Sequence, residues 1–177
     1  MNNKLLALVG IIIVIVILVI ALPSKKSDEA TLGVSDYRNI SYEIDGEDIK
    51  LTNGKAETEA APGSVSKIST ELYSGNEARA DLNNDGKEDI VFLLFQDGGG
   101  TGTFYYVAAA LSSGDSYKGT NAILLGDRIA PQTTEIRDGK IIINYADRKP
   151  DESFSEQPSV GVSKYLKIEG SKLVEIK

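Results

Sequence analysis

Residues 5–22, a run of eighteen residues without a charge or a strongly polar side chain, constrain this chain more than any other feature of its sequence. As an α-helix the run would be about 27 Å long, close to the hydrocarbon thickness of a bilayer. A helix on the surface of a water-soluble protein carries a polar side chain every three or four positions, and this run carries none. The sequence therefore predicts a transmembrane helix within residues 1–22, with a buried core helix as the alternative.

The apolar run could also belong to a cleavable signal peptide, with Val19-Ile20-Ala21 before the cut. Its length and the proline at position 23 favour retention as a membrane anchor instead. Attachment through a lipidated cysteine is excluded, because the chain contains no cysteine.

Basic residues flank the run almost evenly, with Lys4 before it and Lys25 and Lys26 after it, so the positive-inside rule does not decide the orientation. A short tail, one apolar segment and one folded domain form the layout of a signal anchor. We therefore expect a single-pass protein of the cell membrane, held through residues 5–22, with its domain on the extracytoplasmic side.

The remainder of the chain is acidic. Residues 1–22 hold one lysine and no acid, so residues 23–177 carry 18 basic and 26 acidic side chains and a net charge of −8. Such a surface repels nucleic acid, and no nucleic-acid partner is expected. Because the chain has neither cysteine nor histidine, it lacks disulfides, the usual zinc ligands and the usual neutral-pH proton shuttle.

Composition divides the chain into three parts. Residues 23–36 follow the 1–22 anchor, are polar and show no periodicity, which predicts a juxtamembrane linker. Fully extended, this linker would reach about 45–50 Å, enough to hold a domain clear of the headgroups. Residues 37–177 are then expected to form one extracytoplasmic β domain, which is large enough to bury a single core.

The turn signals in residues 37–177 are those of β-hairpins. Three dipeptides that accept positive φ lie beside short apolar runs: Asp45-Gly46, Asn53-Gly54 and Asp138-Gly139. Residues 40–44 alternate between apolar and polar, as half-buried strands do. Four runs are apolar on both faces and predict central strands: residues 90–95, 104–111, 122–125 and 141–143.

These signals predict an all-β fold, an antiparallel sandwich or barrel-like domain of about nine or ten strands, preceded by one N-terminal transmembrane helix. One segment is ambiguous, because Val65, Ile68 and Leu72 have the spacing of a helix face. Ile68, Thr70 and Leu72 also suit a strand, and the serines and threonines around them favour it. Residues 147–158 are too polar for a strand and form the longest predicted loop.

Residues 81–89, DLNNDGKED, form the most specific motif of the chain. Ca²⁺ prefers six to eight oxygen ligands from carboxylates, amides and backbone carbonyls, and alternate positions converge when a loop curls around it. The glycine at position 6 permits the sharp turn. The predicted ligands are four side chains and one backbone carbonyl, that of the lysine: Asp81, Asn83, Asp85, Lys87 and Asp89. A plain acidic turn without metal is the alternative.

The residues after the motif distinguish the type of loop. An EF-hand needs a bidentate glutamate at its twelfth position, where this chain has Phe92, and a strand rather than a helix is predicted after the loop. The motif resembles the calcium loops of FG-GAP repeats in integrin α-subunits, D-x-[DN]-x-D-G-x-x-D, although the Phe-Gly and Gly-Ala-Pro elements are absent. The resemblance covers nine residues and implies a calcium site that stabilises a hairpin rather than one that catalyses.

Other motifs give little support to catalysis. The glycine-rich residues 98–103 precede no predicted helix, so a hairpin loop is expected rather than a phosphate cradle. Ser64-Val65-Ser66-Lys67 matches the S-x-x-K motif of penicillin-binding proteins, but the companion motifs are absent. Acids and arginines at residues 127–128, 137 and 147–148 are expected to form surface ion pairs. No enzyme is expected; the rival class is an envelope hydrolase that cleaves glycan through a carboxylate pair.

Three longer segments, GTFYYVAAAL, LLGDRIAPQTTEIRDGKIIINYADRKP and PSVGVSKYLKIEGSKLVEIK, resemble small bacterial envelope proteins of unknown function. These proteins join an anchor or signal segment to a domain with one D-L-N-x-D-G loop. The resemblance implies a bacterial cell envelope and no particular activity. The sequence thus predicts a calcium-stabilised binding or structural module whose partner is an envelope protein or a glycan.

Overall fold

The computed structural model describes residues 36–176 of the chain. The predicted transmembrane helix in residues 1–22, and all of the 23–36 linker except its last residue, lie outside the described residues. Residues 36–176 contain no helix long and apolar enough to span a membrane. Their elements are one 3-10 turn and twelve strands: η1 (Tyr37–Asn39), β1 (Ser41–Ile44), β2 (Glu47–Lys50), β3 (Lys55–Glu59), β4 (Lys67–Ala80), β5 (Asp89–Asp97), β6 (Thr103–Ser113), β7 (Ser116–Gly119), β8 (Ile123–Asp127), β9 (Ala130–Arg137), β10 (Lys140–Asp147), β11 (Val160–Glu169) and β12 (Lys172–Glu175).

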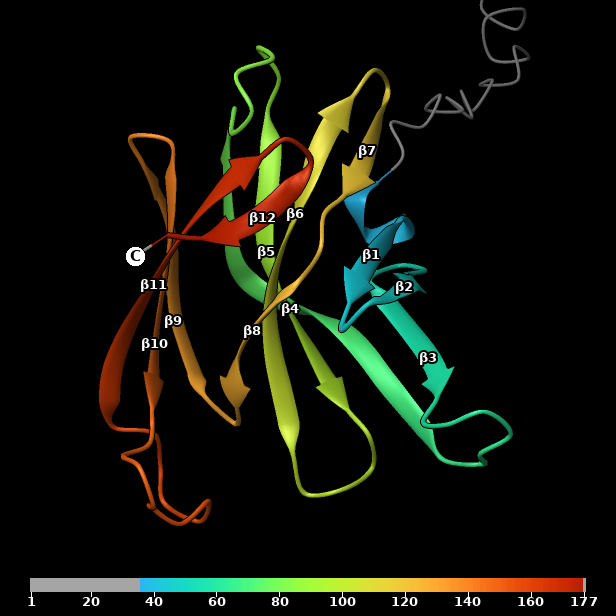
Figure 1. Cartoon of the computed structure of the whole chain (residues 1–177), viewed down its shortest axis with the longest axis vertical. Coiled ribbons are helices and arrows are strands. Elements are labelled where there is room, and N and C mark those ends of the chain that lie inside the picture. The colour runs from blue at the N-terminus through green and yellow to red at the C-terminus, as the bar shows by residue number, and fades with distance from the viewer. Residues whose placement is uncertain (1–35, 177) are drawn as a thin grey trace, which may run out of the picture. The chain divides into compact units, whose positions relative to one another are not determined.

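The strands form three sheets with antiparallel ladders (Figure 1). β1 and β2 form a hairpin, β12-β11-β10-β9 form a four-stranded sheet, and β3-β4-β5-β6-β7 form the largest sheet, to which β8 adds by pairing with β6. The predicted all-β, antiparallel class is confirmed, but the predicted number of nine or ten strands is wrong. β3, β7 and β9 carry few buried side chains and are held by their neighbours' hydrogen bonds, so hydrophobic periodicity did not reveal them.

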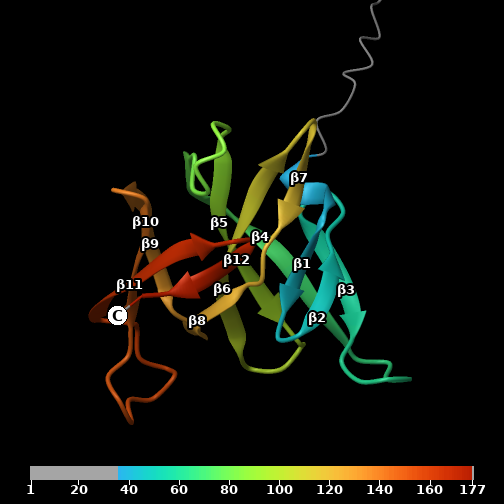
Figure 2. The same ribbon diagram turned by 45° about the horizontal axis from the view of Figure 1, so that its top comes forward.

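β5 and β6 lie at the centre of the largest sheet and are buried on both faces. One set of alternate residues packs against the four-stranded sheet: Val91, Leu93, Val107 and Ala109. The other set packs against η1 and the β1–β2 hairpin: Ile90, Phe92, Leu94, Tyr106, Ala108 and Ala110. The largest sheet is therefore the middle of three layers, which the view in Figure 2 separates. Burial on both faces explains the two longest uninterrupted apolar runs of the domain.

Phe92 is the centre of the layer contact with the hairpin. Its ring lies 5.2 Å from that of Tyr42 and 5.3 Å from that of Tyr37, both tilted or edge-on. Ala108 is its cross-strand partner on β6, and this small residue leaves room for the three rings. Tyr42 is fully buried and donates its hydroxyl proton to the Tyr37 carbonyl at 2.6 Å. The hairpin layer is thus fixed by aromatic packing in addition to apolar burial.

A bulge in β4 connects the two large sheets along one side. The pairing with β5 shifts register between Tyr73 and Ala78, and the intervening residues include Gly75 at φ 85°. Asn76 is buried there and accepts a hydrogen bond from the Thr134 hydroxyl of β9 at 2.5 Å. β4 therefore bends away from the regular ladder and brings its second half to the edge of the four-stranded sheet.

The segment between β7 and β8, residues 120–122, crosses all three layers. The Thr120 backbone N–H donates to the Ala109 carbonyl of β6 at 3.0 Å, and the Thr120 hydroxyl accepts from the Ala109 N–H at 3.0 Å. The Thr120 carbonyl also accepts from the Glu43 N–H of β1 at 3.2 Å. We call residues 120–122 the crossing segment.

Asn121 extends the crossing segment to the third layer. Its Oδ1 accepts from the Leu173 N–H of β12 at 2.9 Å, and its Nδ2 donates to the Leu173 carbonyl at 3.0 Å. One side-chain amide therefore replaces a neighbouring strand for Leu173, which is buried. Each edge strand of the four-stranded sheet is thus bonded to the rest of the domain through a side chain. Asn121 bonds to β12, and Asn76 bonds to Thr134 of β9.

The predicted turns are where the sequence placed them. Asp45-Gly46, Asn53-Gly54 and Asp138-Gly139 all have positive φ at both residues and join consecutive strands or the bridge between Thr52 and Lys55. The ambiguous segment is a strand, because residues 68–72 belong to β4. Val65 precedes that strand and is almost entirely exposed, so it belongs to no helix face.

Gly119 permits the closest approach between β7 and β1. A Cβ atom at this position would overlap the Ser41 carbonyl oxygen and lie 2.8 Å from Cδ1 of Tyr42. Backbone oxygen cannot move aside as a flexible side chain can, so Gly119→Ala is expected to cost about 3 kcal/mol. In a domain of this size the loss corresponds to roughly 10 °C in the thermal midpoint. Gly161→Ala on β11, where no atom lies within 4 Å, should leave the midpoint unchanged in the same scanning calorimetry.

Candidate functional site

The DLNNDGKED motif forms the loop between β4, which ends at Ala80, and β5, which begins at Asp89. Asn84 and Gly86 take up left-handed backbone conformations in it, with φ of 61° and 82°. Glycine has no Cβ to clash, and asparagine tolerates this region better than most residues. These two positions reverse the chain and direct its next amide groups toward the side chains of the preceding residues.

The first three predicted ligands are gathered around that reversal. Oδ1 of Asp81 and Oδ1 of Asn83 both accept a hydrogen bond from the Asp85 N–H, at 3.1 and 2.9 Å. Oδ2 of Asp81 accepts from the Gly86 N–H at 2.9 Å, and Oδ1 of Asp85 accepts from the Lys87 N–H at 2.8 Å. Nδ2 of Asn83 donates to Oδ2 of Asp85 at 3.1 Å. The oxygens of positions 1 and 3 therefore converge on the amide of position 5.

Asp89 occupies a different place from the other three side chains. It is fully buried, and its two oxygens accept from the Leu82 N–H at 2.9 Å and from the Ser112 N–H of β6 at 2.8 Å. Burial raises the pKa of Asp89, the two amide bonds oppose this, and the negative charges of Asp85 and Asp81 add to the rise. Asp89 thus closes the base of the loop and connects it to β6.

The loop carries negative charge that its surroundings do not neutralise. Arg79, on the strand that enters the loop, pairs with Glu88 at 3.5 Å and with Glu77 at 3.6 Å rather than with a predicted ligand. Among the described residues, the carboxylates of Asp81 and Asp85 take part in no ion pair. A bound cation would supply the missing counter-charge.

The chemistry of the loop fits a calcium ion. Each carboxylate oxygen has two lone pairs, so an oxygen that accepts one amide hydrogen bond can still bind a cation. Carboxylates, a side-chain amide and a backbone carbonyl are hard oxygen donors, which Ca²⁺ prefers. The placement fits best for Asp81, Asn83 and Asp85. Over residues 36–176, no group of three or more His, Cys, Asp or Glu side chains is arranged to hold a metal ion, so all five predicted ligands stay predictions.

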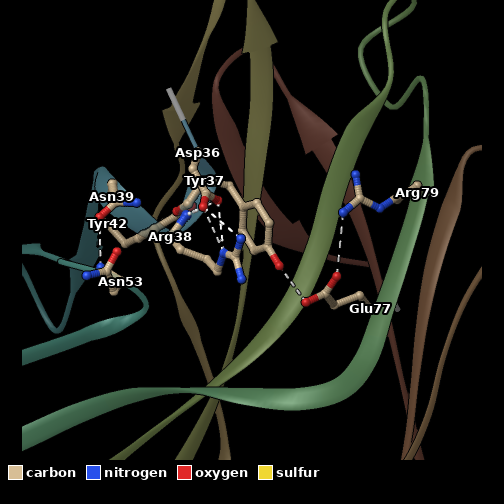
Figure 3. A network of polar contacts seen from close by, with 8 residues as sticks. All are labelled: Asp36, Tyr37, Arg38, Asn39, Tyr42, Asn53, Glu77 and Arg79. Carbon is tan, nitrogen blue, oxygen red and sulfur yellow. Dashed lines mark hydrogen bonds and ion pairs between the residues drawn. The ribbon is translucent and has the colours of Figure 1, made fainter. Parts of the chain in front are cut away.

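A polar network ties the strand that enters the loop to the N-terminal turn (Figure 3). The Tyr37 hydroxyl donates to Oε1 of Glu77 at 2.5 Å, and Glu77 pairs in turn with Arg79. Arg79 also pairs with Glu88 of the loop. The guanidinium carbons of Arg38 and Arg79 lie 5.7 and 5.9 Å from the centre of the Tyr37 ring. Burial raises the pKa of Tyr37 to about 12, and the hydrogen bond to Glu77 acts in the same direction.

The first described residues are fixed by the same network. Asp36 caps the 3-10 turn by accepting from the Arg38 N–H at 3.1 Å, and it also pairs with the Arg38 guanidinium at 2.8 Å (Figure 3). The hydrogen bond from the Arg38 side chain lowers the pKa of Asp36. Oδ1 of Asn39 accepts from the Asn53 N–H at 2.7 Å, which joins the turn to the β2–β3 connection. The described part of the chain is therefore held to the domain from its first residue, Asp36.

The other motifs of the sequence form no catalytic arrangement. In the S-x-x-K segment, the Ser64 hydroxyl accepts from the Ser66 N–H, and Nζ of Lys67 lies 3.4 Å from Glu59. The glycine-rich residues form the β5–β6 connection, as predicted. Asp127 and Arg128 form the predicted ion pair at 2.8 Å.

Arg148 differs from the prediction of an ion pair with Asp147. Its guanidinium donates to backbone carbonyls of Arg128, Glu156 and Phe154, at 2.9, 2.7 and 3.5 Å. The Arg148 guanidinium lies among the backbone carbonyls of Arg128 and of the long β10–β11 loop. Its hydrogen bonds to these carbonyls replace the predicted ion pair with Asp147. The Arg128 guanidinium lies 3.8 Å from the centre of the Phe154 ring, which fastens the same loop.

A hollow beside the β1–β2 turn was not foreseen from the sequence. It has a volume of about 690 Å³ and is lined by Asp45, Glu47 and Glu59 together with apolar residues from four separate segments. Such a set has no signature in one stretch of sequence, because the topology alone brings its members together. Comparison with family models, with curated proteins and with solved structures found no match to the chain.

The raised pKa of Tyr37 predicts a loss of stability at alkaline pH. An unfolded tyrosine loses its proton near pH 10, whereas folded Tyr37 keeps its proton up to about pH 12. Unfolding therefore releases this proton between about pH 10 and 12, and the free energy of unfolding falls as pH rises through that window. Tyr37→Phe should make the fall shallower in urea titrations at pH 7 to 11.5. Tyr165→Phe, at an exposed position, is the control; equal slopes in both variants would contradict the assignment.

Proposed function

We propose that the chain is a membrane-anchored, calcium-stabilised β domain that acts as a binding or structural module on the extracytoplasmic side of the cell envelope. The observation that supports this best is the convergence of Asp81 and Asn83 oxygens on the Asp85 amide, in a loop where Asp81 and Asp85 take part in no ion pair among the described residues. The residues of the loop match the donor types that Ca²⁺ takes in other extracellular modules.

Calcium would act on stability through the position of the loop in the fold. Asp89 holds the base of the loop to the Ser112 amide of β6, and Arg79 links its outer side to the Tyr37–Glu77 pair. A bound cation would neutralise the repulsion among the loop acids. Asp81, Asn83 and Asp85 would orient it, and the folded state would gain the free energy of binding.

A binding or structural role is favoured over glycan hydrolysis. A hydrolase needs two carboxyl groups that face each other across a bond, with free oxygens. In the hollow beside the β1–β2 turn, Asp45 accepts a hydrogen bond from the Tyr106 hydroxyl at 2.8 Å. Glu59 accepts a hydrogen bond from the Gly63 N–H and forms an ion pair with Lys67. These contacts engage both acids within the protein, which supports a structural part for them.

Calcium removal should lower the thermal midpoint. An affinity on the order of 10⁻⁴–10⁻³ M is typical of extracellular modules. At a free calcium concentration ten times the dissociation constant, linkage adds about 1.4 kcal/mol to the free energy of unfolding. For the full chain in neutral detergent we expect chelator to lower the midpoint by about 4–7 °C. An unchanged midpoint, together with no heat of calcium binding in titration calorimetry, would refute the calcium proposal.

Two alanine variants separate the metal from the loop charge. Asp85→Ala removes an oxygen donor at the centre of the loop and should abolish the difference between calcium and chelator. Glu88→Ala removes the same charge from a side chain that faces Arg79, outside the ligand series, and should keep most of the difference. If both variants lost it equally, the effect would be general electrostatics rather than a bound ion.

The membrane topology makes a separate prediction. Because residues 5–22 are long and apolar, we expect the mature protein to retain its N-terminus and to fractionate with membranes. Protease added to intact cells should remove the folded domain. A mature species that begins near Leu22 would contradict retention of the anchor, and a domain protected from protease would contradict the orientation.

A further inference from the structure

The β2–β3 connection leaves two strand edges facing one groove. After the turn at Asn53-Gly54 the two strands share only the bridge between Thr52 and Lys55. In the described part of the chain, β2 pairs with β1 and β3 pairs with β4, so the strands belong to different sheets although they lie side by side (Figure 2). Each strand therefore presents backbone groups on its outer edge that no ladder satisfies.

Two hollows follow these edges, and a third adjoins them beside the β1–β2 turn. The first, of about 620 Å³, lies between β2 and β3 and is lined by residues of both. It shares Thr58 with the 690 Å³ hollow beside the β1–β2 turn. That hollow shares Asp45, Ile68 and Gln96 with a third, of about 350 Å³, which ends at Phe104 and Leu124. We call the three together the β2–β3 groove.

The charge of the groove is negative on balance. Its lining includes five acids: Asp45, Glu47, Asp48, Glu57 and Glu59. Of the nearby lysines, Lys55 pairs with Glu71 at 2.6 Å and Lys67 pairs with Glu59 at 3.4 Å. Lys50 donates to the neutral Asn39 carbonyl at 2.5 Å and keeps its charge. The groove thus offers a ligand more carboxylates than cations.

The far end of the groove is apolar. Phe104 and Leu124 are large hydrophobic residues, 43% and 46% exposed, and they sit with Ile68 in the third hollow. Exposed apolar side chains of this size that adjoin a concave surface are typical of binding sites. In the same hollow the Tyr106 hydroxyl donates a hydrogen bond to Asp45 at 2.8 Å.

We propose that the β2–β3 groove binds an extended peptide that carries basic and apolar side chains. The free edges of β2 and β3 would form hydrogen bonds with the peptide backbone. Glu47 and Glu57 would attract its basic side chains, and an apolar side chain would pack against Phe104 and Leu124. This proposal rests on the binding role proposed above and names its partner. A second copy of the chain fits poorly, because the chain carries a net charge of −7 and would bring acid to acid.

The test uses the full chain in neutral detergent and a fluorescein-labelled hexapeptide, Lys-Val-Lys-Tyr-Lys-Val, followed by fluorescence anisotropy. The same peptide with glutamate in place of lysine is the ligand control. We expect saturable binding of the basic peptide, weakened at least about tenfold in the Glu47→Lys/Glu57→Lys variant. Both positions are exposed, so the variant should keep the wild-type thermal midpoint.

Two matched variants complete the experiment. Asp115→Lys, in the exposed β6–β7 turn, reverses charge away from the groove and should leave the affinity within about twofold. Phe104→Ser should weaken binding of the basic peptide without changing its dependence on salt. Equal binding of the acidic peptide, no effect of the Glu47/Glu57 change, or concentration-dependent dimerisation through the groove would overturn the proposal.

The outcome is separable from that of the calcium proposal. Asp85→Ala, measured in calcium, should still bind the basic peptide at temperatures where it stays folded. Peptide binding in a chain that ignores chelator would support the groove and refute the calcium loop. A calcium-dependent midpoint without peptide binding would do the reverse.

Discussion

The three layers of this domain depend on the crossing segment, residues 120–122. A chain that passes between sheets takes its backbone groups away from regular ladders, and each group left unpaired would cost on the order of 1–3 kcal/mol. Here Thr120 is bonded to β6 and β1, and the amide of Asn121 is bonded to Leu173 of β12. Among the described residues no buried side-chain polar atom lacks a partner. The polar contacts that specify how the layers meet are therefore fully satisfied, which favours this arrangement over other packings of the same strands.

The fold could be predicted from the sequence wherever burial requires a regular pattern of apolar residues. β5 and β6 are covered on both faces and read as unbroken apolar runs, and the Asp-Gly and Asn-Gly turns mark reversals with positive φ. β3, with the sequence KAETE, has no buried face and owes its strand conformation to the ladder with β4. The three-layer arrangement could not be predicted from local sequence either, because contacts such as Asn121 to Leu173 join positions 52 residues apart.

The candidate site divides in the same way. A local motif of nine residues identified Asp81, Asn83 and Asp85, since their spacing alone makes their oxygens converge in a turn. It could not show that Asp89 is bonded to Ser112, because that amide comes from β6 and from outside the motif. The β2–β3 groove, by contrast, is marked by no local motif. Its acids come from several strands and turns, so only the topology reveals that they line adjoining hollows.

The loop and the groove lie at opposite ends of β4, and the bulge at residues 74–77 separates them. Asp81 follows the last residue of β4, whereas Ile68 of the groove is its second residue. The register shift breaks the ladder with β5 between these ends, so a small displacement at the loop is not carried along continuous hydrogen bonds. A cation that binds only the folded state stabilises both ends equally, and it changes the affinity of the groove only if it favours one of two groove conformations. Because the bulge separates the two sites, we expect coupling between calcium and peptide to be close to zero.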